Sequence, residues 1–200
     1  AKVEGRFAYI TSENASITLD LAKASFISIV KDGKEMLGAP SRITVWRAPT
    51  DNDMNQVRRW DGQFIRYSSY ATNSFDIREE NGSVIIDIKG IIGPKARTPL
   101  FYLDIEITVN GGNIKTKFHG VKHKNNYMDQ VPRFGMLFEF AKEFEDIKYA
   151  AYGPGSCYVD MKAHTFYGIY DSTVTDEYDH SMIMPQECGN HIGADMLTLI

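Results

Sequence analysis

Two short stretches hold the residues best suited to polar chemistry. Residues 47–55 read RAPTDNDMN, and residues 184–191 read MPQECGNH. Carboxylates, amides, an arginine and an imidazole at this density can hydrogen-bond a hydroxyl-rich ligand, or they can satisfy the backbone of their own loops. Each stretch is therefore either the rim of a binding cleft or ordinary turn chemistry.

The first stretch supplies the candidate residues of a substrate cleft, which are Arg47, Asp51, Asn52, Asp53 and Asn55. The proline after Arg47 ends strand pairing, because proline has no amide proton to donate. We expect Asp51, Asn52 or Asp53 to cap a short helix over 53–60. We favour this role over direct sugar contact, since short Asp/Asn clusters usually serve turns. An ion pair of Arg47 with Asp51 or Asp53 would hold the loop in shape.

The second stretch predicts a structural loop between strands. Its proline and glycine punctuate a polar segment, and its candidate residues are Gln186, Glu187, Asn190 and His191. These side chains can bond a hydroxylated ligand or the loop backbone.

Patterns typical of metal, cofactor and nucleophile sites are missing from the sequence. His119 and His123 are four residues apart, which suits a metal only on a helix, and Cys157 and Cys188 lack a zinc spacing. Neither a nucleophile elbow nor a glycine-rich nucleotide motif occurs. We expect no metal site, no cofactor and no catalytic residue, with the cysteines as free thiols in a reducing compartment.

Alternating strands must position the two polar stretches. Residues 103–109 and 114–118 alternate apolar and polar side chains around the turn sequence NGGN, which predicts a hairpin. Asn81-Gly82 predicts a second hairpin between 72–80 and 83–89. Further strands are expected at 15–21, 25–30, 134–140, 147–152 and 196–200.

The totals describe an ordinary globular chain. It has 200 residues, of which 43% are hydrophobic and 24% charged, and many short strands with little helix predict an all-β sandwich or barrel. Without a repeat or linker, 1–200 is expected to be one domain. The net charge of -4 argues against nucleic-acid binding. No apolar run reaches the ~18–20 residues of a membrane span.

Three phrases together resemble the last domain of the β-galactosidases of glycoside hydrolase family two. They are WRAPTDND at 46–53, YGPGSCYVD at 152–160 and MPQECGNH at 184–191. The family's counterparts read close to W/T-R-A-P-x-D-N-D, G-P-x-E-N-Y-x-D and P-Q/S-E-N-G-N-R. This chain departs from them at Ser156-Cys157, Val159, Cys188 and His191. Histidine in place of arginine removes a permanent bidentate cation, so the family's ion pairing at 191 is expected to change.

The resemblance implies a fold and a role. The fold is a galactose mutarotase-like β-supersandwich, usually the fifth and final domain, while both catalytic glutamates lie on a separate (β/α)8 barrel. The chain is therefore expected to be inactive alone and to shape a cleft for galactosides such as lactose. Its expected partners are the remaining domains or large subunit of a β-galactosidase, in the bacterial cytoplasm.

The strand pattern at 196–200 indicates a domain truncated at its C-terminus. Missing strands would leave a sheet edge or an apolar face uncovered, so we expect self-association.

Two alternatives stay open. An autonomous aldose 1-epimerase would need an acid and a base, for which His164 or His180 with Glu187 are the candidates. A free carbohydrate-binding module would use the aromatic residues between 149 and 178, although aromatics in strands more often pack as core. These aromatics are Tyr149, Tyr152, Tyr158, Phe166, Tyr167, Tyr170 and Tyr178.

Overall fold

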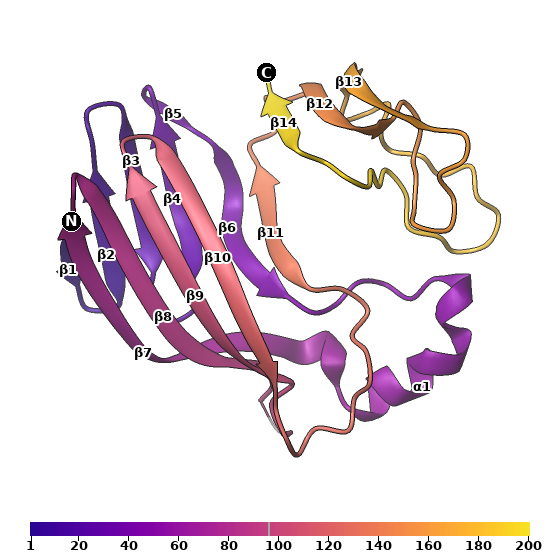
Figure 1. The fold of residues 1–200 in the computed structure, drawn as a ribbon, viewed down its shortest axis with the longest axis horizontal. Coiled ribbons are helices and arrows are strands. Elements are labelled where there is room, and N and C mark those ends of the chain that lie inside the picture. Colours follow the sequence, from indigo (N-terminus) through magenta and orange to yellow (C-terminus); the bar gives the residue numbers. More distant parts are fainter. Residues whose placement is uncertain (96) are drawn as a thin grey trace. The chain divides into compact units, whose positions relative to one another are not determined.

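The computed structural model describes residues 1–95 and 97–200, which divide into two compact units. Unit 1 comprises Ala1–Ala48 and Gln56–Ala141, and unit 2 comprises Pro49–Asn55 and Lys142–Ile200. Antiparallel strands build both units, which confirms the predicted all-β sandwich class (Figure 1). The single domain expected across 1–200 stays a prediction.

Helix is confined to one region of the described chain. It consists of the 3-10 turn η1 (Asp51–Asp53), the helix α1 (Met54–Gly62) and the 3-10 turn η2 (Ile65–Tyr67). The predicted helix over 53–60 is therefore confirmed in place, although it begins one turn earlier as η1.

The first sheet of unit 1 is a five-stranded meander. Its order follows the chain, β1-β2-β3-β4-β5. Side chains of β3 alternate so that Ile17 and Leu19 are buried, and Asp32 and Gly33 take the positive φ that the tight β4–β5 turn requires. The strands are β1 (Lys2–Glu4), β2 (Phe7–Thr11), β3 (Ala15–Asp20), β4 (Ser25–Lys31) and β5 (Lys34–Glu35).

The second sheet of unit 1 has the order β10-β9-β8-β7 and contains both predicted hairpins. Asn81 and Gly82 turn at φ 50° and 75° between β7 and β8. The long strands extend beyond their predicted bounds at 72 and 89, because cross-strand pairing continues through Ser68↔Pro94. The strands are β7 (Ser68–Glu80), β8 (Ser83–Pro94), β9 (Phe101–Asn110) and β10 (Asn113–Lys122).

A two-stranded ribbon completes unit 1. Strand β6 (Leu37–Thr44) pairs antiparallel with β11 (Gly135–Phe140), and the register shifts twice beyond Leu137. Such bulges bend a strand pair.

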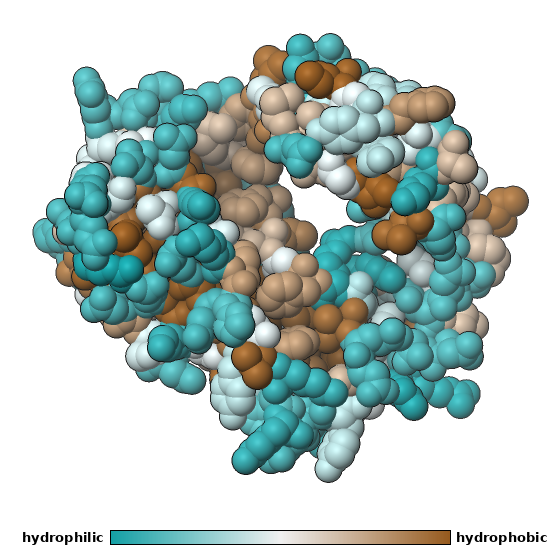
Figure 2. Space-filling model, viewed as in Figure 1, coloured by the Kyte–Doolittle hydropathy of each residue, from teal (hydrophilic) through white to brown (hydrophobic). Residues whose placement is uncertain are grey.

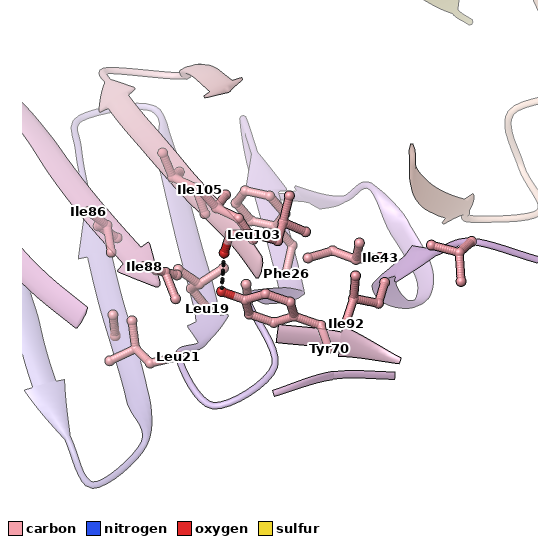
Figure 3. Packing of buried hydrophobic residues seen from close by; sticks show 14 of the residues in the cluster. Leu19, Leu21, Phe26, Ile43, Tyr70, Ile86, Ile88, Ile92, Leu103 and Ile105 are labelled. Atoms are coloured by element: carbon pink, nitrogen blue, oxygen red, sulfur yellow. Dashed lines mark hydrogen bonds between the residues drawn. The ribbon is translucent and has the colours of Figure 1, made fainter. Parts of the chain in front are cut away.

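One hydrophobic core fills unit 1 between its two sheets. Leu19 and Phe26 of the first sheet meet Ile88 and Leu103 of the second, as Figure 3 shows. The Tyr70 hydroxyl, within this core, donates to the Leu103 carbonyl oxygen at 3.2 Å. Each fully buried aliphatic side chain contributes about 1.5–3 kcal/mol, so the sandwich holds together by apolar burial.

Hydrophilic side chains cover much of the surface of the unit 1 sheets that Figure 2 shows. The alternation in β9 has the same consequence, since Ile105 and Ile107 are buried while Asp104 is exposed.

Unit 2 is built on a three-stranded sheet with the order β13-β12-β14. Its strands are β12 (Asp146–Gly153), β13 (Phe166–Thr173) and β14 (Met196–Leu199). Ile147, Tyr149 and Ala151 of β12 form a small core, against which Tyr170 and Leu199 pack. Long loops make up the rest of this unit.

Among the described residues, no helix combines the length and apolar character needed to cross a membrane.

Candidate functional site: three polar segments

The segment 49–55 begins with a capped helical turn. Thr50 is the N-cap residue, and its backbone N–H and hydroxyl donate to the Asp53 carboxylate at 2.7 and 3.0 Å. The N-cap of η1 is thus Thr50 and not Asp51, Asn52 or Asp53, whereas a cap of α1 by one of these residues stays a prediction. Those residues lie inside the turn, because the extended Thr50 (φ -95°, ψ 172°) starts it one residue earlier. The Asp53 carboxylate holds the start of the turn.

Segment 49–55 contacts the distant loop 184–191. The Asp51 backbone N–H donates to the Pro185 carbonyl oxygen at 2.8 Å. Asp51 and Asp53 are half-buried, whereas Asn52 and Asn55 are exposed. Residues 49–55 of the first stretch and the whole second stretch thus lie together in unit 2.

Loop 184–191 also pairs with the segment around Cys157. Cys157 N–H donates to the Asn190 carbonyl oxygen, and the Asn190 side-chain amide donates to the Cys157 carbonyl oxygen, both at 2.7 Å. The Gly189 N–H donates to the Ser156 hydroxyl at 3.0 Å. The Asn190 side chain is therefore engaged with the backbone of the segment around Cys157.

His191 joins the loop to a carboxylate that sequence reasoning missed. Its Nδ1 lies 2.9 Å from the Tyr152 carbonyl oxygen, and its Nε2 lies 2.8 Å from Glu177 Oε2. Each ring nitrogen therefore lies within hydrogen-bond distance of an oxygen that can accept. The side chains of His191 and Glu177 are only 12% and 18% exposed. At position 191 the structure thus has an imidazole–carboxylate contact, and the change from the family's ion pairing stays a prediction.

Tyr149 covers one face of this pair. Its ring lies 4.4 Å from the His191 ring between centroids, and its hydroxyl donates to the Pro154 carbonyl oxygen at 2.9 Å. Burial, followed by the negative charge of Glu177, raises the pKa of Tyr149 to about 12. The phenol therefore stays neutral at physiological pH and serves as a hydrogen-bond donor.

The remaining loop residues lie toward solvent or at its border. Gln186 and Cys188 are exposed, and Glu187 is half-buried. Cys157, in contrast, is fully buried, and its thiol accepts from the Ile192 N–H at 3.4 Å. The two cysteines are free thiols, as predicted.

Arg47 belongs to unit 1. It is half-buried, and its Nη1 donates to the Ala48 carbonyl oxygen at 3.0 Å. Burial and the nearby charge of Arg47 lower the pKa of Arg133. The pairing of Arg47 with Asp51 or Asp53 stays a prediction, since those aspartates belong to unit 2.

A cavity of about 500 Å³ opens among the loops of unit 2. Ser156, Glu177 and His180 line it, while His164 and Glu187 are not among its lining residues within the described chain. His164 instead lies 3.1 Å from the Ser156 carbonyl oxygen through Nε2. Of the candidates suggested for an epimerase, His180 lines this cavity, whereas its suggested partner Glu187 does not.

The aromatic window divides between core and surface. Tyr149 and Tyr170 pack at 5.5 Å in the small core, as aromatics in strands commonly do. Tyr152 and Tyr167 are 36% and 52% exposed and meet edge to face at 5.8 Å. An exposed aromatic pair is therefore available on unit 2.

No group of three or more metal-ligating side chains occurs among the described residues.

Glu177 is the important residue that the sequence did not indicate. It lies in the turn after β13, within the run TDEYDH, where acidic side chains are common and unremarkable. The one signal in the sequence was His191 in place of the family's arginine, because a changed side chain at 191 raises the question of which carboxylate it contacts.

The fold is an all-β sandwich, and the three motif segments cluster in its unit 2. The family model described as "Beta galactosidase small chain" matches residues 11–200, so the chain belongs to this family.

Several curated relatives are β-galactosidases. One from Actinobacillus pleuropneumoniae is 31% identical over 185 residues, which cover 91% of this chain and 18% of the relative. One from Kluyveromyces lactis is 27% identical, covering 100% of this chain and 20% of the relative. The chain thus spans about a fifth of the length of these relatives.

Proposed function

We propose that this chain is a non-catalytic domain of a β-galactosidase that shapes the substrate cleft. The parent enzyme would hydrolyse terminal β-D-galactosides such as lactose. The relatives support the enzyme class, and the resemblance assigns the catalytic glutamates to another domain.

The single observation that carries this proposal is the mutual pairing of the three motif segments. The polar groups of Thr50, Asn190 and His191 are engaged with neighbouring protein groups. Such groups build a rigid loop framework rather than supply free acids and bases. Asp51, Asn52, Asp53 and Asn55 therefore contribute to the cleft by holding its border.

Steady-state kinetics test this role. The purified chain should release no galactose from lactose or from a nitrophenyl galactoside, and turnover at an enzyme-like rate would contradict the proposal. In the parent enzyme, Asp53→Ala should raise KM more than it lowers kcat, because the cleft border loosens while the reacting groups stay in place. Asp171→Ala, an exposed change on β13, is the control.

The exposed aromatic pair gives some support to sugar binding by the chain alone. Tyr152 and Tyr167 expose ring surface on which the C–H face of a galactose could stack. Calorimetric titration with galactose and lactose should show saturable heat that Tyr167→Ala abolishes. An unsaturated signal at millimolar sugar would exclude this second role.

A further inference from the structure

A second cavity, in unit 1, lies along the outer edge of strand β7. Its volume is about 950 Å³, and residues 68–71 of β7 face residues 40–43 of β6 across it. Within the described chain β7 pairs with β8 alone, so its other edge presents unpaired backbone groups. Among the described residues, the backbone of this outer edge forms a hydrogen bond at Thr72, whose N–H donates to the Ala22 carbonyl oxygen at 3.1 Å. This shape suits an extended polypeptide.

Two of the cations on the cavity wall are already neutralised. Arg6 pairs with the fully buried Asp20 at 3.3 Å, and Arg42 pairs with Glu139 at 2.6 Å. Asp20 is the only carboxylate among the residues that line the cavity in the described chain.

Three further cations on this wall face solvent. Lys23, Lys95 and Arg97 are exposed, and within residues 1–95 and 97–200 no carboxylate forms an ion pair with them. Arg97 lies over the Phe64 ring at 4.9 Å. The cavity is therefore positively charged in a chain whose net charge is -4, and it favours an acidic partner.

The spacing of these cations requires an extended partner. Lys23 follows Ala22, which contacts Thr72 of β7, whereas Lys95 follows Pro94, which pairs with Ser68. Four strand residues separate these points, or about 13 Å at the usual rise. One phosphate or carboxylate cannot span that distance, but a segment of several residues can.

The wall chemistry favours a peptide over an oligosaccharide. Its apolar part is aliphatic, with Ile27, Ile43 and Ile91. The single aromatic residue among the described lining residues is Tyr70, which is 6% exposed and offers no ring face for sugar stacking. The Ser68 hydroxyl, which is buried at this wall, has no hydrogen-bond partner among the described residues.

We propose that this cavity docks an extended acidic–apolar segment from another part of the β-galactosidase polypeptide. The segment adds a strand to β7, directs alternate apolar side chains at the aliphatic wall, and places carboxylates near Lys23, Lys95 and Arg97. The source of the segment rests on the proposed function. The relatives are several times longer than this chain and therefore have such segments to offer.

The test uses the ¹⁵N-labelled 200-residue chain and a synthetic peptide of alternating glutamate and leucine. Backbone amides of 68–71 should shift on titration and become protected from hydrogen exchange, and binding should weaken as salt is added. The double variant Lys95→Glu/Arg97→Glu should lower the affinity at least about tenfold, since like charges then face each other. Lys115→Glu on β10, at the opposite edge of the same sheet, should leave it unchanged.

Three results would overturn the proposal. They are unshifted amides at 68–71 in millimolar peptide, equal binding of a lysine–leucine peptide, and protection of 68–71 that rises with protein concentration alone. The last result would make a second copy of the chain the occupant. The experiment measures strand addition at β7 and not hydrolysis. The docking proposal can therefore fail while the proposed cleft role holds, and the cleft role can fail while the docking proposal holds.

Discussion

His191 shows how one residue can decide the order of a loop. It stands where the β-galactosidase pattern has arginine, yet it still reaches a carboxylate and a backbone carbonyl from one side chain. The contact with Glu177 is partly buried, and there the loss of one partner leaves the other unsatisfied. The pair is therefore more important to loop 184–191 than an exposed salt bridge would be.

Replacing His191 should destabilise unit 2. His191→Ala removes two hydrogen bonds and leaves Glu177 without its partner, so we expect a loss of about 1–3 kcal/mol in the free energy of unfolding. Urea denaturation measures it. His180→Ala removes an exposed ring and should change stability by less than about 0.5 kcal/mol. Equal losses of stability in both variants would rule out that His191 stabilises loop 184–191 through its contact with Glu177.

Two buried tyrosines should make stability fall at high pH. Burial raises the pKa of Tyr70 and of Tyr149 to about 12, against 10.0 for an ordinary tyrosine. Between pH 10 and 12 the unfolded state releases protons that the folded state keeps. Their contribution to stability is therefore complete below pH 10 and is lost as the pH rises toward 12.

Absorbance titration and alkaline denaturation check this expectation. Tyr70→Phe should flatten the loss of stability above pH 10, whereas Tyr178→Phe, at a residue 72% exposed, should not. A single titration of all tyrosines near pH 10 in the folded chain would contradict it.

At the scale of elements, hairpins were the easiest feature to predict. The Asn81-Gly82 turn places the start of β8 opposite the end of β7, as the pattern indicated. Strands at 68–71 and 90–94 were missed, because their serines and glycines read as loop and only the partner strand makes them regular. Strand β13 was missed for a related reason, since its aromatic residues do not alternate with polar ones.

The β7–β8 turn should depend on Gly82. Its φ is 75°, and a Cβ there would meet nothing within 4 Å, so Gly82→Ala tests backbone strain alone. We expect a loss of about 1 kcal/mol. Gly62→Ala, at the end of α1 and equally open, should be neutral or stabilising by up to about 1 kcal/mol. Thermal unfolding of the two variants compares them, and a similar loss in both would point to a different cause.

For the whole molecule, the two units differ greatly in their cores. Unit 1 has buried side chains from two facing sheets, whereas the core of unit 2 consists of Ile147, Tyr149 and Ala151. Regions with few buried apolar contacts open locally at lower free energy than well-packed sheets.

Hydrogen exchange should therefore separate the units. Amides of the central strands β8 and β9 should exchange orders of magnitude more slowly than those of β12, and loop 184–191 should exchange fastest. Amide exchange followed by NMR gives the ranking. Protection of β12 equal to that of β9 would show that the small core is not the weaker one.

The sequence by itself determined the local features of this protein. The period-two alternation of 103–109, the Asn-Gly turns and the three family motifs follow from side-chain chemistry within short stretches. The tertiary structure alone decided which stretches meet. The contacts of Asp51 with Pro185 and of His191 with Glu177 join residues far apart in the sequence, and no local pattern encodes them. The same holds for the position of β7 at the edge of its sheet. Such contacts form because buried polar groups must find partners wherever the folded chain brings them.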